Sequence, residues 1–157
     1  MSIRISTAGI SISYAVETTA GTMPTTAASY TKIPEVKEIP EINAEPSTLE
    51  TTTLEETEYK TYIPGLKDLG GALGLTVNFT EDFKTAWEGL VTASETAKAD
   101  GKATWFVIQI PNITEAVYFK AEPSALGFGG AAVDEVAETT VYITPGSAPT
   151  WAAKPTV

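Results

Sequence analysis

The sequence predicts a mainly β protein that carries a single α-helix. In residues 75–79 (LTVNF) apolar and polar side chains alternate, which is the period of a half-buried strand. Residues 80–99 instead place apolar side chains three and four positions apart, as on one face of a helix. Residues 105–110 (WFVIQI) are β-branched and aromatic, which favours a second, central strand. The centre of the chain is therefore predicted to be strand, helix, strand.

The predicted helix has a start signal, an apolar face and a stop signal. Thr80 can cap the first turn through its hydroxyl, and the next two residues are acidic, which the helix dipole favours. Gly101 ends the helix, because glycine adopts the left-handed conformation of a C-terminal cap at little cost. We expect four side chains to pack the helix against the sheet, namely Phe83, Trp87, Leu90 and Val91.

The segment before the central unit predicts three further strands. Residues 9–16 alternate like an amphipathic strand, and residues 17–29 follow as a polar loop. Residues 35–39 have strand character but are flanked by prolines, which confine them to the edge of a sheet. The threonine-rich residues 46–54 suit a strand with a polar exposed face.

Residues 55–71 predict a long connection without regular structure. Pro64-Gly65 and Gly70-Gly71 favour bends in it. A loop of this length inside a compact domain is usually functional. It mixes acidic side chains with apolar ones that have no evident partner, and the residues concerned are Glu55, Glu56, Glu58, Tyr59, Tyr62, Ile63, Leu66 and Asp68.

The segment after the helix predicts a hairpin, a glycine-rich stretch and a last strand. Residues 105–110 and 116–121 pair across a turn at 111–115. The glycine-rich residues 124–132 lead to a strand at 139–144. Residues 145–157 are expected to form an extended C-terminal tail, in which Trp151 is an interface or docking residue.

Length and charge limit the classes of function. A chain of 157 residues fits one domain with its own core. The formal net charge of −10 repels phosphate backbones, so binding of nucleic acid by affinity is not expected. The same charge is compatible with a conduit through which DNA passes without being held.

The residue types present argue against catalysis and against metal binding. The chain has no cysteine and no histidine, so the usual nucleophile–base triads and zinc sites are missing. We therefore assign no catalytic, metal-binding or cofactor-binding residue and expect no enzyme. No apolar run is long enough for a secretion signal or a membrane span, so no membrane anchor is expected.

Three motifs have alternative readings. The runs at 70–74 and 127–130 lack the lysine and the strand-loop-helix context of a phosphate loop, and bends or bulges in strands explain them better. The acids at 55–58 lack the spacing of a calcium loop and read as a solvated acidic loop. The aromatic residues Trp87, Trp105 and Phe106 are core residues or, alternatively, a ligand-binding platform.

The order of these elements resembles the major tail tube protein of phages with long, flexible, non-contractile tails. The segments that carry the resemblance are IPEVKEI at 33–39, ETTTL at 50–54, PGLKDLG at 64–70 leading into LTVNF, and FVIQIPN at 106–112. Each motif is weak alone, and their order over nearly the whole chain carries the resemblance.

The resemblance implies a tail-tube fold, in which an antiparallel β-sandwich or partial barrel is flanked by one α-helix, as a single domain over residues 1–157. It also implies six-membered rings that stack into a hollow tube around DNA and a tape measure protein. A tail terminator and distal tail or baseplate proteins would meet the tube ends. Such a protein belongs to the virion and is assembled in the host cytoplasm, and DNA passes through it without specific binding.

This reading assigns two surfaces. The connection at 55–71, with the eight residues named above, becomes the inter-ring contact. Polar residues opposite apolar strand faces become candidates for the lumen, and these are Glu50, Thr52, Thr76, Asn78, Glu138 and Thr140. Two alternatives stay open: a tube subunit of a related secretion system, and a soluble β-sandwich binding module that uses Trp105, Tyr118 or Trp151.

Overall fold

The computed structural model describes residues 4–69 and 71–156, so the bend expected at Gly70 lies outside the described residues. Within them the chain forms one α-helix, a short 3-10 helix and ten strands. The helices are α1 (Glu81–Ala99) and η1 (Ala27–Ser29). The strands are β1 (Ser11–Val16), β2 (Thr31–Lys32), β3 (Val36–Glu38), β4 (Glu45–Glu50), β5 (Tyr62–Asp68), β6 (Leu73–Asn78), β7 (Thr104–Gln109), β8 (Glu115–Pro123), β9 (Glu138–Pro145) and β10 (Thr150–Ala153).

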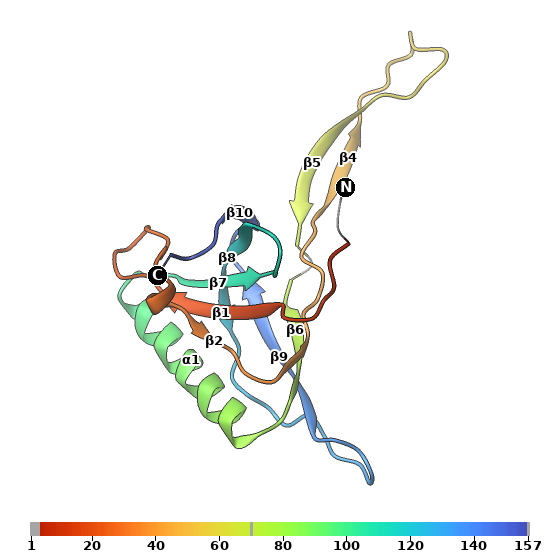
Figure 1. Cartoon of the computed structure of the whole chain (residues 1–157). Coiled ribbons are helices and arrows are strands. Elements are labelled where there is room, and N and C mark those ends of the chain that lie inside the picture. Colours follow the sequence, from red (N-terminus) through yellow and green to blue (C-terminus); the bar gives the residue numbers. More distant parts are fainter. Residues whose placement is uncertain (1–3, 70, 157) are drawn as a thin grey trace. The chain divides into compact units, whose positions relative to one another are not determined.

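The chain divides into two compact units, which are residues 1–40 with 72–157, and residues 41–71. The first unit holds the main sheet, whose described strands run in the order β2-β1-β7-β8-β9-β6-β3, all antiparallel, with β10 paired to β8. Strand β8 joins the two halves, because it pairs with β10 at residues 115–118 and with β9 at 121–123 (Figure 1). The expected sandwich or partial barrel is therefore one curled sheet, a half-barrel.

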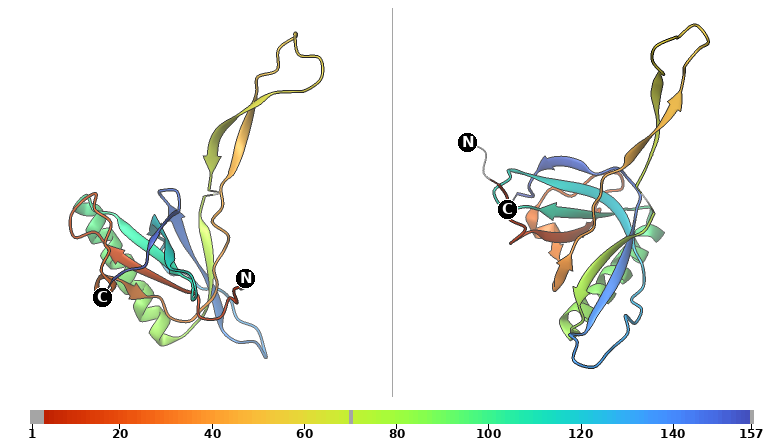
Figure 2. Two further views of the ribbon diagram at one scale, coloured as in Figure 1. Left: turned by 45° about the horizontal axis from the view of Figure 1, so that its top comes forward. Right: turned by 90° about the vertical axis from the view of Figure 1, so that its right-hand side faces the viewer.

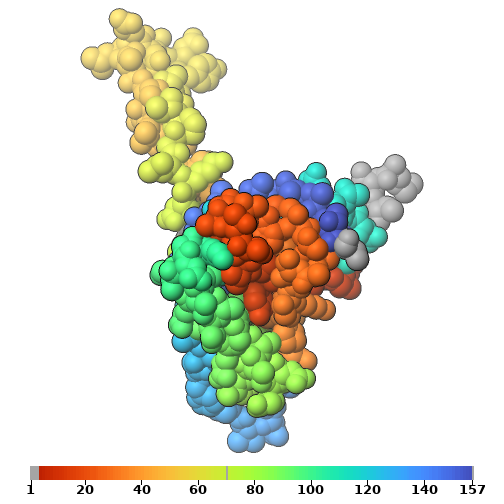
Figure 3. All heavy atoms as spheres, turned by 90° about the vertical axis from the view of Figure 1, so that its left-hand side faces the viewer, coloured from red at the N-terminus to blue at the C-terminus, as the bar shows by residue number. Residues whose placement is uncertain are grey.

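The start and end of the helix match the prediction, and Phe83, Trp87 and Leu90 of its four predicted packing residues are buried. The Thr80 hydroxyl accepts a hydrogen bond of 3.1 Å from the Phe83 amide, and α1 ends at Ala99. Its buried side chains form one stripe, Phe83, Trp87, Leu90, Ser94 and Ala97. Val91 is only partly buried, because Leu90 and Ser94 occupy the inward positions of those turns. Figure 2 shows α1 along one side of the sheet, and Figure 3 shows its outer side beside the red and orange N-terminal segment.

A second apolar cluster covers the other face of β7 and β8. Val107, Ala116 and Tyr118 are buried there, with Met23 and Tyr30 packed against them. The Tyr118 hydroxyl donates a hydrogen bond of 2.7 Å to the carbonyl of Ala153. Burial raises the pKa of Tyr118 and that of Tyr30 above the usual tyrosine value. The segment at 17–29, expected as a polar loop, thus contributes side chains that cover the sheet.

The C-terminal tail is not a free extended segment. Residues 150–153 form β10, which pairs with the first half of β8. Thr156 also bridges to the 17–30 segment, because its amide donates to the Thr25 carbonyl at 2.9 Å. Residues 145–157, expected as an extended tail, are thus hydrogen-bonded to β8 and to the segment at 25–27. Trp151 remains half exposed on β10.

The second unit is an antiparallel hairpin of β4 and β5 (Figure 1). The expected structureless connection at 55–71 is therefore wrong for its second half, which is strand from Tyr62 to Asp68. Pro64-Gly65 does not end this strand, because it lies at a register shift opposite Ser47. A Cβ atom at Gly65 would stand 2.4 Å from the Ser47 Oγ, so a side chain at this position would force the Ser47 hydroxyl to move.

Candidate assembly interface

The hairpin of β4 and β5 exposes apolar side chains on a two-stranded ribbon. Leu49 and Ile63 face each other across the strands and both remain about half exposed, while Leu66 is 91% exposed. A two-stranded hairpin is marginally stable in water when it has nothing to pack against. These side chains are therefore available for contact with another protein surface.

The end of the hairpin is held together by threonine hydroxyls. The Thr51 amide donates to the Thr61 carbonyl at 2.8 Å, and the Thr61 amide donates to the Thr52 hydroxyl at 2.9 Å. The Glu56 carboxylate accepts from the Thr53 amide and from the Thr61 hydroxyl, at 3.2 Å each. The ends of the tip segment at 53–60 are thus fixed, although all its residues are exposed.

All eight predicted contact residues lie in this hairpin. Glu55, Glu56, Glu58 and Tyr59 are in the tip, and Tyr62, Ile63, Leu66 and Asp68 are on β5. Among the described residues, the carboxylates of Glu55 and Glu58 make no hydrogen bond or ion pair. The tip therefore presents two carboxylates without a direct partner among the described residues, beside the exposed Leu54 and Tyr59.

Four of the six lumen candidates come together on one face of β6 and β9. Thr76 pairs with Thr140 and Asn78 with Glu138, while the opposite face carries the buried Leu75, Val77 and Val141. The Glu138 carboxylate forms an ion pair with Lys37, next to the edge strand residue Glu38. The other two candidates, Glu50 and Thr52, belong to the hairpin unit.

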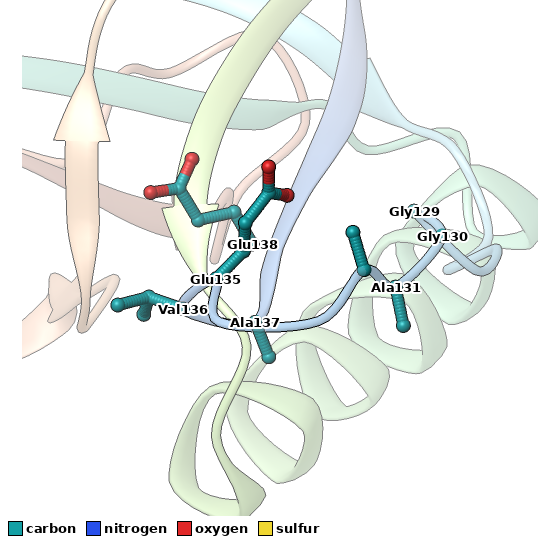
Figure 4. Close-up of a pocket in the computed structure, with 8 residues that line it drawn as sticks. Gly129, Gly130, Ala131, Glu135, Val136, Ala137 and Glu138 are labelled. Atoms are coloured by element: carbon teal, nitrogen blue, oxygen red, sulfur yellow. The ribbon is translucent and has the colours of Figure 1, made fainter.

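The connection between β8 and β9 forms a third exposed surface. Phe128, Val133 and Val136 are all largely exposed on it. It borders an open depression of about 610 Å³. In Figure 4 the carboxylates of Glu135 and Glu138 point to the same side of the loop, away from Ala137. Glycine and alanine supply most of the lining, so few polar groups converge there to hold a small molecule.

Glu17 is a polar group that sequence reasoning missed. It is 3% exposed, and its carboxylate accepts hydrogen bonds from the Trp105 indole at 3.0 Å, the Ala103 amide at 2.7 Å and the Gly21 amide at 3.3 Å. Burial raises the pKa of Glu17, but these three donors and the nearby Lys120 outweigh burial and hold that pKa below the ordinary carboxyl value. Glu17 fixes the start of β7 and has no reactive partner.

Within residues 4–69 and 71–156, no group of three or more acidic side chains gathers as a metal ion would require. No helix in the same ranges combines the length and the apolar character that crossing a membrane demands. The hairpin, the polar face of β6 and β9 and the β8–β9 loop are exposed surfaces, and each is a candidate for contact with other chains.

The sequence profile of the phage tail tube protein (TTP) family matches residues 4–154. The chain belongs to the phage tail tube protein family. It is therefore a structural protein of the virion tail and not an enzyme. No curated protein matches this tail tube protein in sequence.

Solved structures share the fold of this tail tube protein. A chain of the six-fold symmetrised anti-feeding prophage baseplate aligns with a TM-score of 0.65 and 10% identity, over 98% of both chains. A chain of the tube-terminating cap of the anti-feeding prophage aligns with a TM-score of 0.63 and 12% identity, over 98% of this chain and 93% of that one. A chain of the tail of an empty gene transfer agent particle, refined with C6 symmetry, gives 0.55 and 14%, over 92% and 96%.

Proposed function

We propose that this tail tube protein assembles into hexameric rings that stack into the hollow tube through which phage DNA is ejected. The observation that carries the proposal is the hairpin of β4 and β5, whose apolar side chains stay exposed in the single chain. Burial of Leu49, Ile63 and Leu66 against the next ring would stabilise stacking, at about 25 cal/mol for each Å² of apolar surface removed from water.

The six-fold count is supported by the symmetry of the similar structures. The anti-feeding prophage baseplate is described as six-fold symmetrised, and the gene transfer agent tail as C6. A ring of six copies needs a heterologous, head-to-tail contact that closes on itself. The β8–β9 loop and the half-exposed Trp151 are surfaces for that contact within a ring.

The lumen wall is proposed to be the polar face of β6 and β9, with Thr76, Asn78, Glu138 and Thr140. Glu50 and Thr52 would join this wall only where the hairpin lines the channel. A polar, acid-leaning wall does not bind phosphate groups, so DNA moves along it without specific binding. The helix α1, with Lys84, Glu88 and Glu95 exposed or partly exposed, would lie on the outside of the tube.

The proposal includes the partners of such a tube. A tape measure protein would occupy the lumen before DNA, and a tail terminator and distal tail or baseplate proteins would close the ends, as the cap relative does for the anti-feeding prophage. Assembly would take place in the host cytoplasm. A tube subunit of a related secretion system has the same architecture and differs in what passes through the tube.

Electron microscopy of the purified chain over a concentration series tests the proposal. Rings or tubes with six-fold end views are the expected result, and a chain that stays monomeric at every concentration would contradict it. A monomeric outcome would favour a binding module. Of the aromatic residues considered for that alternative, Tyr118 is 1% exposed and Trp105 is partly buried, so Trp151 alone of the three would be at least half exposed to a ligand.

A further inference from the structure

A small pocket in the first unit lies between the C-terminal part of α1 and strands β7 and β8. Its volume is about 170 Å³. That volume is below the usual range of small-molecule sites, which is about 300–1,000 Å³. Three lysines line it, Lys98, Lys102 and Lys120, together with Glu122 and Thr104. Its size and charge suit a single anionic side chain.

The wall of the pocket contains a buried hydroxyl, that of Thr104. The residue is 4% exposed, and among the described residues its hydroxyl oxygen has no hydrogen-bond partner. A buried polar group without a partner is costly, and native proteins rarely leave one. Because that oxygen is closed to solvent, it lies within the wall of the pocket and is not a contact point for a ligand.

The lysines leave an excess of positive charge. Lys98 lies 3.4 Å from the Glu122 carboxylate, and the Lys120 ammonium stands 5.2 Å from the centroid of the Trp105 ring. The Lys102 ammonium has no hydrogen bond or ion pair among the described residues. Among the lining residues three lysines face one acid, Glu122, and Lys120 also lies near the buried Glu17, in a chain whose net charge is −10.

A structural explanation accounts for only part of this cluster. Lys98 is in the last turn of α1, where a positive charge interacts favourably with the helix dipole, and it also pairs with Glu122. Neither interaction gives the Lys102 ammonium a partner. The lining therefore keeps one lysine with which an acid from outside the chain could pair.

We propose that the pocket receives a carboxylate from the hairpin tip of a second copy of this chain, Glu55 or Glu58. The inference rests on the proposed self-assembly and identifies one contact of it. The tip at 53–60 holds three acids and one lysine, whereas the pocket lining holds three lysines and one acid. Because the pocket is too small for a folded element, the tip would insert one side chain and lay the exposed Leu54 and Tyr59 on the surrounding surface.

Charge reversal on both sides tests the pair. Lys102→Glu is expected to raise the critical concentration for tube formation about tenfold, because it sets like charges against each other. Combined with Glu55→Lys or Glu58→Lys, it should return to within about threefold of the wild-type value, since opposite charges meet again. Lys84→Glu is the matched control, an equal charge change on α1 away from the pocket, and should assemble like wild type.

The outcomes separate the contact from the function. If the wild-type chain forms no tubes, the proposed function fails. If it forms tubes but Lys102→Glu behaves like Lys84→Glu, or neither tip reversal rescues it, the contact is wrong and the function stands. Near-ultraviolet circular dichroism of each variant identifies misfolding, and a folded Glu58→Lys single variant with impaired assembly supports the contact independently.

Carbodiimide coupling of wild-type tubes gives a second readout, because it joins only ammonium and carboxylate groups that touch. Peptide mass spectrometry should find Lys102 or Lys120 joined to Glu55 or Glu58 in tubes and not in dilute subunits. Inorganic phosphate, added at constant ionic strength, should shorten tubes if it competes for the pocket. Phosphate binding without the crosslink would make the pocket a site for a solution anion and overturn the contact.

Discussion

The indole Nε1 of Trp105 donates a hydrogen bond of 3.0 Å to the carboxylate of Glu17, a residue 88 positions earlier in the chain. The same carboxylate also accepts from the Ala103 and Gly21 amides. One buried acid thus joins the end of β1, the loop after it and the start of β7. Substitution of Glu17 therefore tests how the N-terminal segment is held on the sheet.

We expect Glu17→Gln to destabilise the subunit by about 1–3 kcal/mol. The amide removes the negative charge and places its own N–H donors against the N–H groups that now donate to the carboxylate. Urea unfolding of the unassembled subunit measures this. Glu95→Gln, at an exposed position of α1, is the control and should change the free energy of unfolding by under about 0.5 kcal/mol. Equal effects of the two variants would contradict the role of Glu17.

The contribution of Glu17 should depend on pH in a defined direction. Its pKa in the folded protein is lowered from the ordinary value of 4.5, so the folded state favours the ionised form. The stability difference between wild type and Glu17→Gln should therefore be fully present above pH 4.5 and shrink as the pH falls through the folded pKa. A difference that grows on acidification would contradict this sign.

Trp87→Ala should destabilise the subunit by about 3–5 kcal/mol, because Trp87 is fully buried and leaves a large cavity. Trp87→Phe keeps most of the apolar volume but loses the indole hydrogen bond of 2.9 Å to the Ser124 carbonyl. Its cost should be smaller, and thermal unfolding of both variants measures the difference. A loss under about 1 kcal/mol for Trp87→Ala would count against this packing.

Gly65→Ala should distort the hairpin, because its Cβ would overlap the Ser47 Oγ. Ser47→Ala in the same chain removes that atom and should restore the hairpin, although it also loses the Ser47 hydrogen bond to the Leu66 carbonyl. The readouts are amide hydrogen exchange of β5 and tube length by electron microscopy. If the double variant recovers neither readout, the contact between the new Cβ and the Ser47 Oγ is not the cause of the distortion.

Labelling can separate the outer and inner walls of the tube. The natural chain has no cysteine, so Thr140→Cys and Glu95→Cys each introduce a single thiol. A polymer-linked maleimide too bulky to enter the channel should label both in free subunits and only the Glu95→Cys variant in tubes. Equal labelling of Thr140→Cys in tubes would remove the face of β6 and β9 from the lumen.

Local periodicity was enough to predict the helix and most strands. The start and the buried face of α1 are set by residues within one or two turns of each other, namely Thr80, Phe83, Trp87 and Leu90. Over so short a distance, residue spacing alone decides which side chains share a face of the helix. The edge position of β3 followed from its prolines. These signals are local, so a single sequence contains them.

What the sequence did not predict depends on distant contacts or on exposure. Strand β5 is exposed on both faces, so it has no apolar alternation, and Pro64-Gly65 reads as a bend although it forms a bulge. Strand β10 is defined by its pairing with β8. Glu17 and Tyr118 are buried and form hydrogen bonds to residues far along the chain. The lack of a hydrogen-bond partner for the Thr104 hydroxyl can be recognised only in the structure.

The main sheet ends in strands of two and three residues, β2 and β3, and Pro34 precedes β3 while Pro40 follows it. A protein that accumulates in order to polymerise risks amyloid-like aggregation through its sheet edges, where unpaired N–H and C=O groups recruit further strands. Edges this short have few unpaired N–H and C=O groups, and proline has no backbone N–H to donate. The hairpin, by contrast, keeps six- and seven-residue strands with open edges. The short edge strands therefore limit the addition of further strands to the main sheet. The β4–β5 hairpin, which ordered assembly would use, stays open to strand addition.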